Sequence, residues 1–374
     1  MASQSDFQST MVERRRKLIT ELQSRGLRFE SPANGASSRR GGAGPSDHKA
    51  ITVMGTTVMV PVHTHTASDS PFSARPVDDT RHARLFDGSD EVGMVTFPPQ
   101  PKFYALQTED GIPYWKIAQL HAQDVLATTV LQNCIRYPDA GTRCQFCAIG
   151  ESLKAGRTIA SKSPQQLAEV TEAARRLDGI EHVVMTTGTP PTPDRGAAVL
   201  SDCAAAITRR VSIPIQAQCE PPTSFDWFPR LRDSGVTALG MHLEAFDPEV
   251  RARIMPSKAE LSLDYYMKAY KAAVPVFGRG EVSTYLLAGL GDSKQLLLEG
   301  CRKLIDIGVY PFVVPFVPVT GTPLEHHASP DSEFMLSVLE PLGEMLKAAE
   351  MTSDRIKAGC GKCGACSPLS TFET

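Results

Sequence analysis

The chain has 374 residues, with 28 glycines, 28 prolines, nine cysteines and a formal net charge of −3. This weak charge excludes the broad basic surface that binds nucleic acid through its phosphates. No apolar run reaches the roughly 18 residues of a membrane-spanning helix, and the polar stretch from Met1 to Lys17 lacks the apolar core of a secretory signal. We therefore expect a cytoplasmic protein that binds neither nucleic acid nor a membrane.

The N-terminal third predicts a helix, a linker and a small β-rich domain. Residues 8–25 have helical spacing of apolar side chains, and residues 30–46 are rich in Gly, Ser, Ala and Pro, as in a linker. An alternative for Arg39, Arg40, Gly41 and Gly42 is a loop that binds a phosphate or carboxylate. Short β-like runs follow, at residues 51–62, 92–97, 102–106 and 114–120.

The central part of the chain alternates apolar strands with amphipathic helices. Six strands are predicted, at residues 128–133, 182–188, 213–218, 237–245, 282–290 and 310–319. Five helices lie between them, at residues 163–177, 197–210, 225–233, 262–274 and 293–307. This alternation predicts a parallel α/β sheet with right-handed crossovers. Because a complete TIM barrel has eight such units, we expect a partial, TIM-like (β/α)6 barrel.

A last helix is predicted at residues 336–350, and the polar tail behind it carries three cysteines. The predicted domains are the helix and linker (1–48), the small β-rich domain (49–125), the partial barrel (126–335), and the C-terminal helix with its cysteine-bearing tail (336–374).

Six of the nine cysteines form two tight groups, which is unlike the spread of a disulfide scaffold. The first group, Cys134, Cys144 and Cys147, has the spacing CX9CX2C and follows the first predicted barrel strand, where α/β barrels keep reactive groups. Three thiolates suffice to hold three irons of a four-iron cluster and leave one iron for another ligand. A structural zinc site needs four protein ligands, and no fourth Cys or His lies nearby in sequence. Zinc or unligated thiols are the alternatives.

This group, with Phe146 before its last cysteine, resembles the radical S-adenosylmethionine (SAM) superfamily, although the usual motif there is CX3CX2C. Residues 242–253, the glycine-rich stretch 282–292 and the Gly-Thr-Pro-Leu-Glu string at 321–325 resemble the biotin synthase group in the same order. The resemblance implies a [4Fe–4S] cluster that binds SAM and cleaves it to a 5′-deoxyadenosyl radical. It also implies a small-molecule substrate and an electron donor such as flavodoxin or ferredoxin.

The resemblance further implies the residues that contact SAM. Glu244 and Arg253 would hold its amino and carboxylate groups, and Phe146 would pack on adenine. The backbone at Thr186, Thr187 and Gly188 would bind the amino group. Gln218 shares a strand face with Gln216 and Glu220 and is expected to point into the barrel mouth. The alternative for these side chains is a buried polar network, which we prefer for Gln216.

The second group, Cys360, Cys363 and Cys366, has the spacing CX2CX2C, with glycines that allow the backbone to wrap a cluster. We predict an auxiliary [4Fe–4S] cluster here. A zinc clasp is the main alternative, with His326, His327 or Cys301 as the fourth ligand, and unligated thiols are the other. Of the three scattered cysteines, Cys219 is expected to face the chemistry, and Cys203 and Cys301 to lie in the core.

A second cluster suggests sulfur transfer, because lipoyl and biotin synthases use an auxiliary cluster as their sulfur source. We therefore predict a radical SAM sulfurtransferase that acts in cofactor or natural-product biosynthesis. The alternatives are a dehydrogenase, epimerase or rearrangement enzyme whose auxiliary cluster moves an electron or binds substrate, and a zinc-stabilised protein without catalysis. The segments 41–45 and 360–367 also resemble a little-characterised bacterial radical SAM family encoded near nitrilase-like enzymes, a likeness that supplies no substrate.

Overall fold

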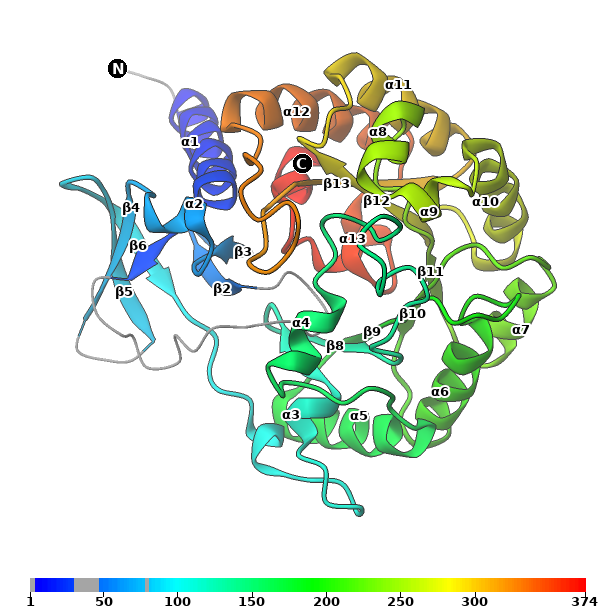
Figure 1. The fold of residues 1–374 in the computed structure, drawn as a ribbon. Coiled ribbons are helices and arrows are strands. Elements are labelled where there is room, and N and C mark those ends of the chain that lie inside the picture. The colour runs from blue at the N-terminus through cyan, green and yellow to red at the C-terminus, as the bar shows by residue number, and fades with distance from the viewer. Residues whose placement is uncertain (1–3, 30–46, 78–80) are drawn as a thin grey trace.

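The computed structural model describes residues 4–29, 47–77 and 81–374, which form two sheets and the helices around them. The predicted linker at residues 30–46, including the alternative anion-binding loop at Arg39–Gly42, lies outside the described residues. The larger sheet curls into a half-barrel with helices on its outer side, and the small sheet lies beside its open edge (Figure 1).

The larger sheet has seven strands in the order β13-β12-β11-β10-β9-β8-β7. The parallel strands are β8 (Val125–Thr129), β9 (His182–Thr186), β10 (Ile215–Gln218), β11 (Ala238–Gly240), β12 (Val282–Ala288) and β13 (Val309–Pro315). These six neighbours in chain order confirm the predicted partial barrel. Their burial on both faces explains why they read as continuous apolar runs.

Helices follow the strands and cover the outer face of this sheet (Figure 1). The long ones are α5 (Pro164–Asp178), α6 (Ala197–Arg210), α10 (Leu263–Phe277), α11 (Lys294–Asp306) and α12 (Ser332–Ala348). Shorter ones are α4 (Ile149–Lys154), α7 (Trp227–Asp233), α8 (Pro248–Ile254) and α9 (Pro256–Ala259). Local sequence sets their starts: Ser163 and Gln166 form a capping box at α5, and Ser262 and Ser293 cap α10 and α11.

The small domain is a six-stranded sheet in the order β1-β4-β5-β6-β2-β3, packed against the N-terminal helix α1 (Gln4–Arg25). Its strands are β1 (Arg28–Phe29), β2 (His48–Val53), β3 (Thr56–Pro61), β4 (Phe72–Pro76), β5 (His82–Asp87) and β6 (Asp90–Thr96), with a short helix α2 (His65–Ser68) after β3. Leu18, Ile19 and Leu22 of α1 are buried in the core of this domain. The predicted helix and hairpin are therefore present and form one unit.

Two of the predicted strands are wrong. Residues 102–105 form a 3-10 helix and Tyr114–Ile117 form α3, each directly after a proline that is its N-cap, so that only residues 119–120 of the predicted run 114–120 are in a strand. The next segment, β7 (Gln119–His121), pairs antiparallel with β8 and belongs to the barrel sheet. The barrel sheet thus begins before residue 126, because a tight turn at residues 122–124 makes the neighbouring β8 the nearest partner.

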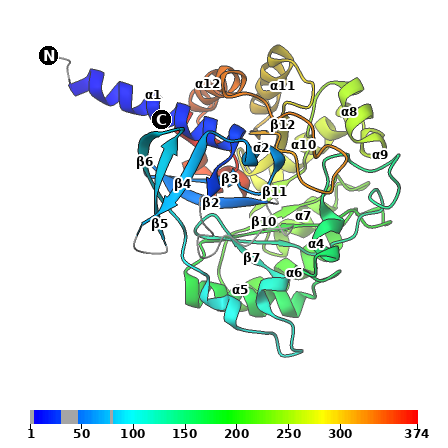
Figure 2. The same cartoon turned by 60° about the vertical axis from the view of Figure 1, so that its left-hand side comes forward.

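The C-terminal tail runs back into the barrel after α12. It forms a 3-10 turn at Ser353–Arg355, the short helix α13 (Cys360–Cys363) and a 3-10 helix at Pro368–Phe372. Arg16 of α1 holds the end of this tail, because its Nε donates to the Thr371 carbonyl at 2.8 Å and its guanidinium lies 4.8 Å from the centre of the Phe372 ring. Turned by 60°, the cartoon shows α1 and the small sheet on the same side as the C-terminus (Figure 2). Within the described part of the chain, no helix combines the length and the apolar character that a bilayer crossing requires.

Candidate active site

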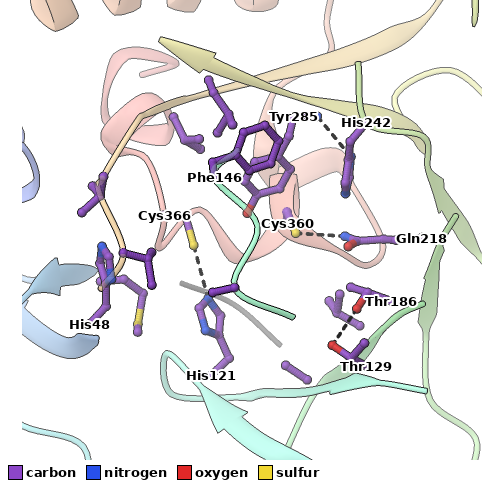
Figure 3. Close-up of a pocket in the computed structure, with 18 of the residues that line it drawn as sticks. His48, His121, Thr129, Phe146, Thr186, Gln218, His242, Tyr285, Cys360 and Cys366 are labelled. Carbon is purple, nitrogen blue, oxygen red and sulfur yellow. Dashed lines mark hydrogen bonds between the residues drawn. The ribbon is translucent and has the colours of Figure 1, made fainter. Parts of the chain in front are cut away.

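A cavity of 390 Å³ occupies the inside of the partial barrel. Its wall combines the barrel strands, the loop with the first cysteine group, the cysteine-bearing tail, and the small domain (Figure 3). Of the residues predicted from sequence, those that line it are Phe146, Cys147, Thr186, Thr187, Gln218, Glu244, Cys360, Cys363 and Cys366. The cavity is therefore lined by all three tail cysteines and by Cys147 of the first group, whereas Cys134 and Cys144 are not among its described lining residues.

The loop that carries the first cysteine group starts after β8, at the carboxyl end of the sheet, as predicted. A buried ion pair anchors it: Arg136 Nε and Nη2 each lie 2.8 Å from a different carboxylate oxygen of Glu220, the residue two after β10. Burial alone would raise the pKa of Glu220, but the Arg136 guanidinium and the charge of Lys258 together outweigh it, and the net pKa is lowered. Arg136 also donates to the Ser257 carbonyl, which ties the loop to α9.

Gly188 permits the close approach of this loop to the end of β9. A Cβ at Gly188 would lie 2.1 Å from the carbonyl oxygen of Asn133, the residue that precedes Cys134 in the chain. The Gly188 amide donates to the Leu131 carbonyl at 2.8 Å, and the Ile135 amide donates to the Thr189 carbonyl at 2.9 Å. Any larger side chain here would displace the first cysteine, so a glycine is required on structural grounds.

Burial favours the protonated form of two thiols in the first group, Cys144 and Cys147. Burial raises the pKa of Cys144 to about 12, and Lys258 opposes this rise. Burial also raises the pKa of Cys147 to about 11, and the charge of Cys134 adds to it. The three sulfurs therefore lie within electrostatic reach of one another, and metal binding here must release protons.

The tail cysteines lie against residues of the barrel sheet. Gly359 donates its amide to Nδ1 of His182, the first residue of β9, at 3.2 Å. Cys360 Sγ accepts from Nε2 of Gln218 at 3.1 Å, and Cys366 Sγ lies 3.5 Å from Nε2 of His121 (Figure 3). The sequence predicted that these thiols lie in a polar tail. In the structure this tail folds back, so that the thiols contact residues of the barrel strands.

Tyr285, on β12, reaches two of these thiols. Its hydroxyl hydrogen-bonds to Cys360 and Cys366, and its pKa is raised well above the ordinary value, first by burial and then by these sulfurs. Burial likewise raises the pKa of Cys360 and Cys363. The three thiols and the phenol thus form one buried, polar wall of the cavity.

The small domain completes this wall and holds the tail in place. The Ala365 carbonyl, between the last two cysteines, accepts from the Met59 amide at 2.7 Å and from Gln23 Nε2 at 3.0 Å. Gln23, His48 and Met59 also line the cavity. The N-terminal domain therefore closes one side of the site, a role that the sequence left open.

The two charged residues expected to hold SAM are placed differently. Glu244 lines the cavity, adopts a left-handed φ of 71°, and pairs with Lys258 at 3.1 Å. Arg253 is not among the described cavity-lining residues, and its Nη2 donates to the Leu290 carbonyl at 2.9 Å. Lys258, which is buried and acts electrostatically on Cys144, was missed because nothing in its local sequence marks it.

Several other expectations are also settled by the fold. Cys203 and Cys301 are buried in the core as expected, but Cys219 also packs there and is not among the described cavity-lining residues. His326 pairs with Glu325 at 3.6 Å, and His327 Nε2 lies 2.9 Å from the Gly289 carbonyl. Neither histidine nor Cys301 lines the cavity with the tail thiols. His48, His121 and His242 line it instead, and of these His121, in the edge strand β7 of the barrel sheet, contacts a tail thiol.

The donor sets match iron–sulfur clusters in their chemistry. Each has three thiols on a flexible, partly glycine-containing loop, and each lies at or beside the cavity. No group of three or more His, Cys, Asp or Glu among the described residues is arranged to hold a metal ion as the side chains stand. A four-iron cluster is several ångströms across, so its ligands do not converge on a point as they do around one ion. The residues therefore fit such a group by donor type and placement.

Comparison with known proteins agrees with this geometry. The Radical SAM superfamily model matches residues 137–308, which run from the first cysteine loop to the end of α11. The chain is 26% identical over 242 residues to a bacteriochlorophyllide c C-7(1)-hydroxylase from Chlorobaculum limnaeum, and the match spans 60% of each chain.

Two solved structures are similar at low identity. A radical SAM methyltransferase from Sphaerobacter thermophilus has a TM-score of 0.46 at 17% identity, covering 78% of this chain and 76% of the other. Methylornithine synthase has a TM-score of 0.44 at 17% identity, covering 58% and 60%. The family match over residues 137–308, together with the three cysteines in the loop after the first parallel strand, identifies a radical SAM domain in this chain.

Proposed function

We propose that this enzyme cleaves SAM reductively and uses the 5′-deoxyadenosyl radical to abstract hydrogen from a small molecule, into which it then transfers sulfur. Cys134, Cys144 and Cys147 would hold the cluster that binds SAM, and Cys360, Cys363 and Cys366 an auxiliary cluster. When bound, the first cluster supplies the electron that breaks the S–C5′ bond, and the second supplies the sulfide for a new C–S bond.

One observation carries the proposal: Cys147 of the first group and all three tail cysteines line a single cavity. A substrate in this space would lie between the SAM site and the second group of thiols. Radical chemistry followed by sulfur transfer needs this arrangement, because the substrate radical must meet its sulfur donor before it meets solvent. A tail cluster on the outer surface of the barrel could not deliver sulfur to a substrate radical formed inside it.

The described residues around the cavity also indicate what it accepts. Glu244 is the only Asp, Glu, Lys or Arg among them, and its charge is paired with Lys258. Because no guanidinium or ammonium group of the described residues lines the space, the wall offers no permanent positive charge to a phosphate. We expect a largely apolar substrate, oriented by hydroxyls and amides such as those of Thr129, Thr186 and Gln132.

We propose the following roles for the predicted SAM contacts. Glu244 would accept from the amino group of SAM, and the strand end at Thr186 to Gly188 would offer backbone groups. Phe146 packs beside Phe316 and Leu324 and borders the cavity, where its ring would pack on adenine. Arg253, held by the Leu290 carbonyl, would act through the segment it supports.

The test is anaerobic reconstitution followed by single turnover. We expect about eight irons per chain, 5′-deoxyadenosine on addition of reductant and SAM, and loss of cluster sulfide in step with product. Substituting Cys144 or Cys147 should abolish SAM cleavage, whereas substituting Cys360, Cys363 and Cys366 should leave cleavage and abolish product. A tail cluster that keeps all its sulfide after turnover would overturn sulfur transfer. We expect flavodoxin or ferredoxin to replace the chemical reductant.

A second candidate comes from the hydroxylase with which the chain shares 26% identity. In this case the substrate radical would be oxidised by one electron and take oxygen from water, and the tail cluster would only accept the electron. The product then gains oxygen-18 from labelled water and no sulfur, and the tail cluster remains intact. The same single-turnover experiment therefore separates the two functions.

A further inference from the structure

His121 is a buried histidine that faces the tail cysteines from the opposite wall of the cavity. It is the last residue of β7 and pairs with Val125 at the start of β8, so its backbone is fixed by the barrel sheet. Its side chain is 6% exposed and lines the cavity. Its Nε2 lies 3.5 Å from Cys366 Sγ, and the two side chains point at each other (Figure 3).

Three thiols leave one iron of a four-iron cluster without a protein ligand, and three other polar side chains touch the same thiols. Gln218 contacts Cys360 through an amide nitrogen, which has no lone pair to give to iron. Tyr285 contacts Cys360 and Cys366 through a hydroxyl, which would have to lose its proton in a buried place. The imidazole of His121 does not have to lose a proton to bind iron, because one nitrogen of its neutral form already carries a lone pair, and imidazole is a common iron ligand.

We propose that His121 is the fourth protein ligand of the auxiliary cluster, an inference that rests on the proposed function. The cluster would then be held by Cys360, Cys363, Cys366 and His121. The hydrogen bond between imidazole and thiol then gives way to two bonds to iron. Nε2 binds and the proton stays on Nδ1.

This ligand has two consequences for the cluster. A neutral imidazole in place of a thiolate leaves one negative charge fewer on the site, which raises the reduction potential, as histidine ligands do in Rieske centres. Histidine is also the one ligand of the four that belongs to the rigid barrel sheet, whereas the three cysteines belong to the tail. The ligand set therefore ties the tail to the barrel across the cavity.

The test uses the full-length reconstituted protein grown with ¹⁵N-histidine, reduced and without SAM, so that no substrate nitrogen is present. Pulsed EPR should show a directly bound ¹⁵N on one cluster. His121→Ala should remove this coupling, and His48→Ala, which removes another cavity-lining histidine, should leave it. His121→Cys should keep about eight irons and lower the potential of the tail cluster below that of the wild-type protein.

The Cys134→Ala/Cys144→Ala/Cys147→Ala variant keeps the tail group alone and separates two kinds of failure. If this variant binds about four irons but shows no histidine coupling, or keeps the coupling after His121→Ala, the ligand assignment is overturned and the auxiliary cluster stands. If it binds zinc or no metal while the wild-type protein binds about four irons, the auxiliary cluster itself is overturned. A circular dichroism spectrum like that of the wild-type protein shows that the variant is folded.

Discussion

The ion pair between Arg136 and Glu220 should be a large contributor to the order of the first cysteine loop. Both side chains are nearly buried, with 11% and 9% exposed, and the pair is bidentate at 2.8 Å. Arg136→Met leaves the Glu220 carboxylate buried and without its main partner, which costs about 3–5 kcal/mol. With an unfolding entropy of about 2.1 cal/mol/K per residue over 374 residues, each kcal/mol is worth about 1.3 °C. We therefore expect the midpoint of apo-protein unfolding to fall by about 4–6 °C.

Differential scanning calorimetry and urea unfolding measure this loss, and two further variants test its cause. Arg136→Met/Glu220→Met removes both charges and should recover part of the stability, because no unpaired charge remains. Arg210→Met breaks the exposed pair with Glu172, at 3.3 Å, and should cost less than about 1 kcal/mol. If Arg136→Met costs no more than Arg210→Met, or if the double variant is no more stable than Arg136→Met, the reasoning is refuted. On reconstitution, Arg136→Met should lose iron from the first group while the tail group retains its own.

Three further predictions concern the anchoring of the tail. Burial is the main cause that lowers the pKa of His182 from 6.5 to about 4. The free energy of unfolding is therefore full above pH 6.5, and a part on the order of 3 kcal/mol is lost as the pH falls from 6.5 through 4, because the unfolded state takes up a proton that the folded state does not. Urea unfolding of His182→Gln over this pH range should not show the loss. Gly359→Ala should reduce the iron bound by the tail and lower the free energy of unfolding by about 1–3 kcal/mol. The reason is that φ at this position is 101° and the new Cβ would lie 2.2 Å from the Gln216 side chain. Unchanged iron content would contradict this. Gln23→Leu removes the 3.0 Å hydrogen bond to Ala365, so we expect about 1 kcal/mol less stability and faster loss of iron from the tail to a chelator, with the first group unaffected.

The order of elements was readable from the sequence because parallel strands buried on both faces are continuous apolar runs. The six predicted strands at residues 128–319 correspond to β8–β13, and serines at positions 163, 262 and 293 mark the starts of α5, α10 and α11. The edge strand β7 was missed because three residues are too few to show alternation, and its place is set by pairing with β8.

The same distinction holds for the site. Cysteine spacing alone identified the two groups of thiols, because ligands on one short loop are close in sequence as well as in space. Lys258, Gln23 and His121 reach the site from elements far from either group, and no local pattern marks them. Their meeting depends on the curvature of the sheet and on the tail folding back beneath α1. Local sequence therefore identified the cysteine thiols as candidate cluster ligands. Only tertiary packing determined which side chains contact them, because it brings together residues more than 200 positions apart.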